Sequence, residues 1–369
     1  MATNHEIDRR EFLQQAAVVG TGLWLPQARP DSSPGEHEIT LGAWPHRIYK
    51  ENDGVLEPAT TESFVFNLLV KERQNRMIDP LSARLEFYSS GDRVHLIELS
   101  RKALEGIRSV SIATREPDRE DEVFDFRHYF SLPLILAVDR LDYELLLRRP
   151  DKGGETRTRL EIPLLRYEQK TKLIFPIKGK FVVGLGHDFN EPHSDGLSQH
   201  VAYDVLGTGP HWEITRNGGA VPADIYTWGR EVIAPADATV IYARNDVPDQ
   251  PILGTIDRKL YENVPNPPGP PGNQVTLDHG NDEYSDFGHM QRGSVRVKAG
   301  DRVKQGDVLG QVGTSESPFP HLHYQFQRLG KPAYFADGLP SRFENVSFDL
   351  YGKPIKIVSP KRGLPLEAH

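Results

Sequence analysis

The chain has 369 residues, a length that two domains with terminal segments would account for. Its formal net charge of -8 and pI near 6.0 argue against a nucleic-acid-binding protein, whose surface would be basic. The absence of cysteine excludes disulfides, thiolate metal sites and a cysteine nucleophile, so a metal would have to be bound by His, Asp or Glu. With 29 prolines and 32 glycines, the composition favours many short strands over long helices.

Residues 1–30 have the features of an export signal. Arg9 and Arg10 are followed by Phe and Leu, and then by a short apolar run over residues 16–25. This order resembles the signals of the bacterial twin-arginine export pathway, and the run is too short to cross a membrane. A helix start with two solvated arginines is the alternative. We therefore expect an exported, periplasmic protein without a transmembrane segment, and we exclude these residues from the fold.

Residues 31–165 have the pattern of a strand-rich domain. Short runs of alternating apolar residues cover 63–70, 83–88, 94–99, 132–138, 143–147 and 158–164. The Ser-Ser-Gly-Asp sequence over residues 89–92 predicts a hairpin connection between two of these runs. Antiparallel strands at this spacing predict an immunoglobulin-like β-sandwich. The fold class is therefore expected to be mainly β.

Residues 166–345 differ in composition, because eight of the fourteen histidines lie between positions 187 and 323. Glycines at turn spacing over residues 295–313 predict a compact antiparallel sheet with tight hairpins. Lipoyl and biotinyl carrier domains share this pattern, but Lys298 and Lys304 lack the sequence context of an attachment lysine. Residues 346–369 are expected to be a C-terminal tail.

Two local patterns in the histidine-rich region could bind a metal. The first is His200-x-x-x-Asp204, whose side chains would lie about 13 Å apart on a flat strand but within about 6 Å across a turn. Joint metal binding therefore predicts a bent chain here. The second is His321-Leu-His323, whose histidines would lie about 6.6 Å apart on one face of a strand, with Leu322 facing the core. Each pattern is weak alone, and together they favour a metal site.

Four sequence blocks carry a resemblance to a known family. They read QHVAYDV, REVIAPADATV, NQVTLDHG with its continuation to GQVGTS, and PHLHYQF. Over about residues 180–345 the chain resembles the lysostaphin-type (LytM-like) zinc endopeptidases of cell-wall metabolism. The resemblance implies a barrel-sandwich-hybrid-like peptidase domain that binds one zinc ion through His200, Asp204 and His323. It also implies that His289 and His321 flank a zinc-bound water as catalytic residues.

The function that this resemblance implies is hydrolysis of the peptide cross-links of bacterial peptidoglycan by a zinc-activated water. The alternative is a catalytically inactive module that binds peptidoglycan or activates a cell-wall amidase. All five family positions carry their expected residues, which favours the enzyme. Among the other histidines, we expect His279 to be structural and His211 to lie on the surface, whereas His187 and His193 could line the cleft. Residues 244–273 form an insertion relative to the family.

Overall fold

The computed structural model describes residues 39–45, 47–52, 60–72, 78–109, 122–149, 153–186, 199–265, 271–328 and 337–369. The predicted export signal, His187 and His193 lie outside these ranges, as does the side chain of His200. None of the helices in the described ranges is long and apolar enough to span a membrane.

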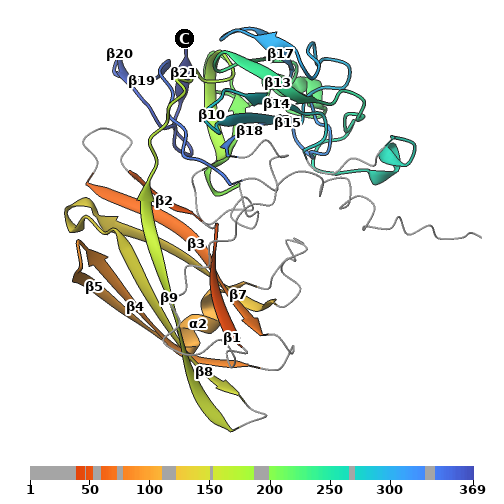
Figure 1. Ribbon diagram of the computed structural model, residues 1–369. Coiled ribbons are helices and arrows are strands. Elements are labelled where there is room, and N and C mark those ends of the chain that lie inside the picture. The colour runs from red at the N-terminus through yellow and green to blue at the C-terminus, as the bar shows by residue number, and fades with distance from the viewer. Residues whose placement is uncertain are drawn as a thin grey trace, which may run out of the picture. The chain divides into compact units, whose positions relative to one another are not determined.

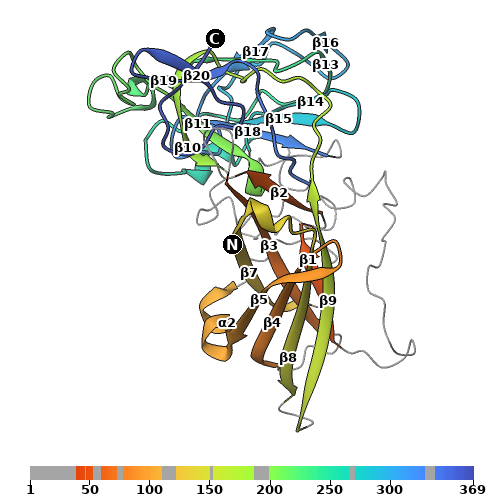
Figure 2. The same ribbon diagram turned by 90° about the vertical axis from the view of Figure 1, so that its left-hand side faces the viewer.

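By strand pairing, the first strand-rich region is one nine-stranded sheet, which folds into two facing layers that Figures 1 and 2 show from two sides. Its elements are β1 (Ile39–Trp44), β2 (Ile48–Asn52), β3 (Thr61–Glu72), β4 (Asp79–Ser89), β5 (Asp92–Ser100), α2 (Arg101–Ile107), β6 (Arg108–Ser109), β7 (Glu122–Pro133), the 3-10 turn η2 (Leu134–Leu136), β8 (Arg140–Arg149) and β9 (Gly154–Arg166). One layer contains β5, β4, β8 and β9 in that order, and the other contains β1, β2, β3, β7 and β6. A short parallel pairing of β2 with β9 joins them.

The alternating pattern of β8 shows why these strands form layers. Leu141, Tyr143, Leu145 and Leu147 are buried, and the residues between them are partly exposed. Period-two burial places one strand face in a core. The two layers meet there, because rings of β4 and β8 contact β7: Phe87 and Phe130 have centroids 5.2 Å apart. The mainly β class and the hairpin after β4 are thus confirmed, and the immunoglobulin type stays a prediction.

The second region has its own hydrophobic core. Its elements are β10 (Gly179–Gly186), η4 (Gln199–Val201), β11 (Tyr203–Gly207), η5 (Pro222–Asp224), β12 (Glu231–Ile233), β13 (Ala238–Ala243), η6 (Arg258–Tyr261), β14 (Val275–Asp278), β15 (Tyr284–Gly288), β16 (Arg302–Val303), β17 (Val308–Gln311), β18 (Leu322–Gln327), β19 (Val346–Leu350), β20 (Lys353–Lys356) and β21 (Leu366–Ala368). Ten strands form one sheet in the order β16-β13-β14-β15-β18-β11-β10-β21-β19-β20, and β12 pairs with β17. Strand β18 therefore lies between β15 and β11, as Figure 1 shows for β15.

The last residues of the chain correct one expectation. Residues 346–369 were expected to be a tail, but they form β19, β20 and β21. Strand β21 pairs with both β10 and β19, and Leu366 at this strand is fully buried. The segment is thus part of the sheet and its core. The domain boundaries stay predictions.

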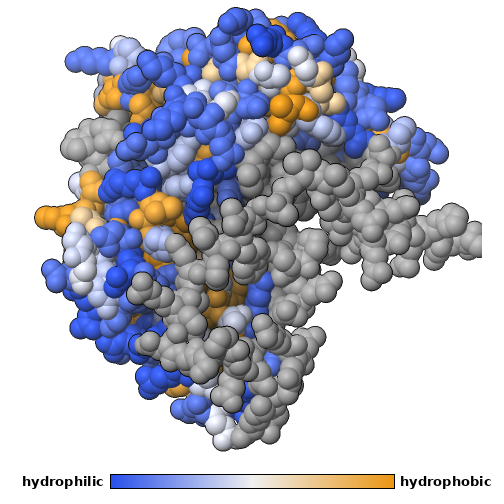
Figure 3. Space-filling model, viewed as in Figure 1, coloured by the Kyte–Doolittle hydropathy of each residue, from blue (hydrophilic) through white to orange (hydrophobic). Residues whose placement is uncertain are grey.

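The face of the molecule in Figure 3 is mostly hydrophilic over the described residues, with hydrophobic residues in small groups. Small scattered groups of this kind are normal on protein surfaces and do not indicate a binding site.

Candidate active site

The site begins where β11 and β18 pair. Their antiparallel register places Asp204 directly opposite His323. The chain before Asp204 is bent, because His200 lies in the 3-10 turn η4 and β11 starts at Tyr203. The bend that joint metal binding requires is therefore present in the backbone.

Asp204 is the point on which two histidines converge. Its Oδ1 atom lies 3.1 Å from Nδ1 of His323 and 3.2 Å from Nε2 of His321. The side chains of all three residues are mostly buried, with exposed fractions of 12%, 1% and 14% for Asp204, His323 and His321. Leu322 between the two histidines points into the hydrophobic core, as predicted. The structure thus brings both histidines of the second pattern to the carboxylate of the first.

His289 joins this group from the end of β15. Its ring centroid lies 4.7 Å from that of His321 and 6.1 Å from that of His323. The preceding residue, Gly288, is paired with His323, and a Cβ there would lie only 2.4 Å from Pro271. A glycine is therefore required for this close approach. His289 itself has a left-handed backbone, with φ of 56°.

The protonation pattern of two histidines follows from their backbone partners. Nδ1 of His289 lies 2.8 Å from the carbonyl oxygen of Ser315, and Nδ1 of His321 lies 2.9 Å from that of Phe319. A carbonyl oxygen only accepts, so Nδ1 is the donor in both rings. In the neutral ring Nε2 then carries the lone pair, which can accept a proton.

Electrostatics distinguish these two histidines. Burial lowers the pKa of His289 well below its ordinary value, and the neighbouring His321 and His323 lower it further. Burial also lowers the pKa of His321, but the charge of Asp204 and the hydrogen bond to it outweigh this effect and raise the pKa overall. The cluster therefore combines an imidazole that favours the neutral form, His289, with one that binds a proton more readily, His321.

The donor set has the chemistry of a zinc site. Two ligand atoms on one tetrahedral zinc ion, with bonds of about 2.0–2.1 Å, lie about 3.3 Å apart. The separation of Asp204 Oδ1 and His323 Nδ1, 3.1 Å, is close to this value. No group of three His, Cys, Asp or Glu side chains that could hold a metal occurs among the described residues, and the side chain of His200 is not one of them. Asp204 and His323 fit two positions of the ion, and the third position stays a prediction.

Two other described histidines of this region have structural or exposed positions. His279 bonds the carbonyl oxygen of Asp237 through Nδ1 at 3.1 Å and the hydroxyl of Ser285 through Nε2 at 2.8 Å. Both ring nitrogens are thus used in structural contacts, in agreement with its expected role. His211 is exposed, as predicted.

Comparison with known proteins shows similarity to one family over part of the chain. Residues 215–334 match the model of Peptidase family M23. The chain is thus similar to peptidase family M23 over this M23 segment. The M23 segment contains His289, His321 and His323, whereas Asp204 lies before it and joins the site through the pairing of β11 with β18.

Two curated relatives match this part of the chain. Peptidoglycan DD-endopeptidase ShyC of Vibrio cholerae is 34% identical over 99 residues, which are 27% of this chain and 19% of that protein. Endolysin 2638A of Staphylococcus phage 2638A is 36% identical over 87 residues, 22% of this chain and 16% of that protein. The matches thus span less than a fifth of the length of either relative.

Solved M23 structures are also similar in part. The catalytic domain of the prophage-encoded M23 protein EnpA from Enterococcus faecalis is 20% identical, covers 43% of this chain and 87% of that chain, and gives a TM-score of 0.26. A zinc-containing peptidase from Vibrio cholerae is 11% identical, covers 77% of this chain and 83% of that chain, and gives a TM-score of 0.23.

Sequence patterns did not reveal the groups that orient the two histidines. These groups are the carbonyls of Ser315 and Phe319 and the hydroxyl of Ser317, which lies 3.2 Å from Nδ1 of His321. A backbone carbonyl carries no residue-type signal. The nearby order Ser-x-Ser-x-Phe-Pro, directly before the histidine pair, is the only local cue that could have pointed to this loop.

Proposed function

We propose that the chain is a zinc-dependent endopeptidase that hydrolyses the peptide cross-links of bacterial peptidoglycan. The observation that carries the proposal is the convergence of Asp204 with His289, His321 and His323 of the M23 segment in one buried cluster. A structural cluster would use up its ring nitrogens, as His279 does. Here Nε2 of His289 remains for chemistry, and Nε2 of His321 lies beside the proposed zinc ligand Asp204.

His200, Asp204 and His323 would hold the zinc ion, one per chain. When bound, zinc lowers the pKa of a coordinated water to about 7 and polarises the scissile carbonyl. Asp204 supplies a carboxylate oxygen from β11, and His323 turns Nδ1 toward it from β18. Both come from central strands of the sheet, which fix their separation.

His289 and His321 would move the protons of the reaction. Amide hydrolysis requires a base that takes a proton from the attacking water and an acid that protonates the leaving amine. Each ring is fixed by its Nδ1 donor bond, so Nε2 has a defined position, which in His321 is 3.2 Å from Oδ1 of Asp204. A neutral imidazole held in this way accepts a proton without first rotating.

The relative named a peptidoglycan DD-endopeptidase supports a cross-link as the substrate. Muropeptides from purified peptidoglycan, incubated with the zinc-loaded chain and separated by mass spectrometry, test this directly. We expect cross-linked dimers to become monomers, with a new amine and carboxylate at one bond. The His321→Ala variant is the matched control and should leave dimers intact. Intact dimers with the wild type, together with retention of the chain on peptidoglycan, would instead support the inactive module.

Export is part of the same proposal, because peptidoglycan lies outside the cytoplasmic membrane. Arg9 and Arg10 in the twin-arginine pattern support it. Replacing both by Lys should leave the chain in the cytoplasm of a host with that pathway, as cell fractionation would show. Unchanged export of this variant would contradict the twin-arginine route.

A further inference from the structure

The insertion over residues 244–273 contacts residues 314–319, which orient His289 and His321 and are called the histidine-orienting loop. In this loop, Thr314 donates its amide to Oδ1 of Asp249 at 2.7 Å and its hydroxyl to the carbonyl of Gln250 at 3.0 Å. Pro318 accepts a hydrogen bond from the amide of Gly254 at 2.8 Å. The insertion therefore contacts the histidine-orienting loop at both of its ends.

One peptide unit at the centre of the loop is held from both sides. Its carbonyl, from Ser315, accepts the hydrogen bond of His289 Nδ1 at 2.8 Å. Its amide, from Glu316, donates to the hydroxyl of Tyr261 at 3.0 Å. The carbonyl and amide of a trans peptide point in opposite directions. Tyr261 and His289 thus bond the two opposite edges of one rigid peptide plane.

The orientation of this plane is not the one that its own backbone prefers. Glu316 has φ of 55°, in the left-handed region that side chains other than glycine rarely adopt. Turning the peptide plane over would bring this φ back to negative values. It would also turn the Ser315 carbonyl away from His289. The bond to Tyr261 opposes that rotation.

Space at the carbonyl is also restricted by the insertion. Gly272 has φ of 72°, and a Cβ there would lie 2.4 Å from the Ser315 carbonyl oxygen. The hydroxyl of Ser315 accepts from the amide of Asn273 at 2.9 Å and donates to the carbonyl of Met290 at 2.8 Å. The insertion thus leaves room for the carbonyl in the orientation that accepts from His289.

We propose that Tyr261 is a positioning residue, which holds the Ser315–Glu316 peptide so that His289 carries its proton on Nδ1 and presents Nε2 to the substrate. Tyr261 acts through the peptide and does not touch the substrate itself. The inference rests on the proposed function for its effect on turnover. Its effect on the tautomer of His289 is independent of any substrate.

The test is Tyr261→Phe in the full chain, which removes the hydroxyl and keeps the ring. The variant loses the bonds that the hydroxyl accepts from the Glu316 amide and from Nε2 of Gln250. Loss of the bond that holds the peptide shifts its equilibrium by about fivefold. We expect kcat to fall about fivefold to tenfold with KM unchanged, because the peptide then samples the reversed orientation. Nitrogen NMR of the histidine-labelled chain should show the protonated signal of His289 moving partly from Nδ1 to Nε2. The spectrum of His289→Gln assigns these signals.

Tyr167→Phe is the matched control, because it removes a half-buried hydroxyl that bonds Glu283 outside the loop. It should leave both kcat and the His289 tautomer at wild-type values. Unchanged kcat and an unchanged tautomer in Tyr261→Phe would overturn the proposal. A changed tautomer in a chain that cleaves no peptidoglycan would support the positioning role and refute the proposed substrate. If Tyr261→Phe lowers the melting temperature no more than Tyr167→Phe, lost folding does not explain its effect.

Discussion

The two strand-rich regions each bury a histidine, but they surround it differently. His128 in β7 stacks on both Phe66 and Phe130, with ring centroids 5.1 and 5.7 Å away. Its Nε2 lies 3.1 Å from the hydroxyl of Tyr143. His289 instead contacts a backbone carbonyl and two other imidazoles. Burial lowers the pKa of both, so burial alone does not mark a site. What distinguishes the candidate site is that the neighbours of His289 are themselves titratable.

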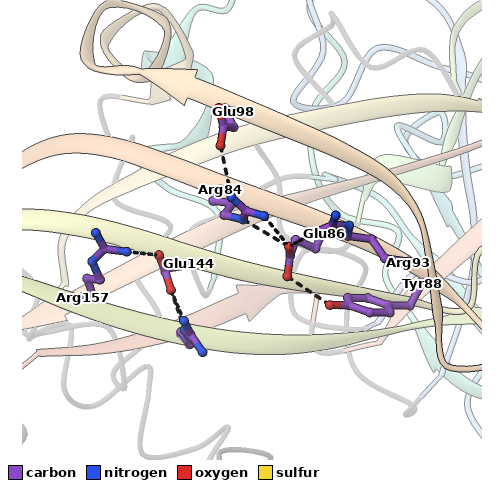
Figure 4. A network of polar contacts seen from close by, with 8 residues as sticks. Arg84, Glu86, Tyr88, Arg93, Glu98, Glu144 and Arg157 are labelled. Atoms are coloured by element: carbon purple, nitrogen blue, oxygen red, sulfur yellow. Dashed lines mark hydrogen bonds and ion pairs between the residues drawn. The ribbon is translucent and has the colours of Figure 1, made fainter.

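The two regions also differ in the surroundings of their charged groups. The outer face of the sandwich carries a network of Arg and Glu side chains on neighbouring strands, which Figure 4 shows. These groups are paired with one another near water. The carboxylate of Asp204 is mostly buried, and its Oδ1 lies beside the imidazoles of His321 and His323. Solvated pairs hold a surface together weakly, whereas a buried carboxylate beside imidazoles is suited to bind a cation.

The largest expected effect concerns the metal. His323→Ala removes a ligand from β18, so the zinc content should fall from about one ion per chain to near zero. Asp204 would then remain buried with fewer partners, which also lowers stability. Metal analysis of the purified protein after zinc reconstitution measures this. A wild-type chain that takes up no zinc would refute the proposed metal site.

The companion variant is His321→Ala, which should keep its zinc. We expect turnover to fall about 10²- to 10⁴-fold, because a proton-transfer group is lost while the ligands remain. His279→Gln, directly after β14, is the matched control and should keep both zinc and turnover. If His321→Ala loses the metal and His323→Ala retains it, the roles within the pair are reversed.

The sequence predicted the parts of the site that depend on residue type and local spacing. Alternating apolar runs predicted the strands, and the His200–Asp204 spacing predicted the bend that η4 introduces. The histidine-orienting contacts could not be predicted, because they join segments 26 residues apart at His289 and 55 residues apart at Tyr261. Each contact depends on the direction of one carbonyl or amide, which the chain acquires only after both segments fold.

The C-terminal strands were missed for a different reason. Strand β21 has only 3 residues, too few for an alternating pattern to be recognised. Its pairing partner β10 lies far earlier in the chain. Short strands of this kind form because the sheet edge is already present to pair with them. The local sequence contains no pattern that predicts this pairing.

A smaller effect is expected in the response of the sandwich to acid. Burial lowers the pKa of His128 from 6.5 to about 3, so the folded chain keeps it neutral where the unfolded chain binds a proton. Its contribution to stability is therefore complete above pH 6.5 and is lost as the pH falls toward 3. The slope is about 1.4 kcal/mol per pH unit between these limits. Urea unfolding at several pH values measures this slope. The unfolded fraction is read from hydrogen exchange of β7 and β8 in a labelling step that is always run at the same pH.

His128→Gln should remove this slope while lowering stability at pH 7, because Gln does not take up a proton. His95→Gln, at an exposed position of β5, is the control and should retain the wild-type slope. A full slope in His128→Gln would show that another group controls the acid response of this region.

The smallest expected effect concerns the surface network. Hydrogen bonds from Arg84 and Arg93 lower the pKa of Glu86 to about 2. Nη2 of Arg84 lies 2.9 Å and Nη1 of Arg93 lies 2.6 Å from Oε1 of Glu86. Surface ion pairs contribute about 0.2–1 kcal/mol each and are weakened by salt. Glu86→Gln should therefore lower the free energy of unfolding by less than about 1 kcal/mol, and less still at high salt.

The pH windows of the two groups allow their effects to be separated. Glu86 has a lowered pKa, so its contribution is complete above pH 4.5 and is lost as the pH falls toward 2. Between pH 6.5 and 4.5 the His128 contribution changes and that of Glu86 does not, so Glu86→Gln should leave the slope in that range unaltered. Glu98→Gln is the control, because Glu98 accepts a single bond of 3.3 Å from Arg84 and is 68% exposed. A loss for Glu86→Gln as large as that for His128→Gln would mean that the exposed network, and not the buried ring, stabilises the sandwich.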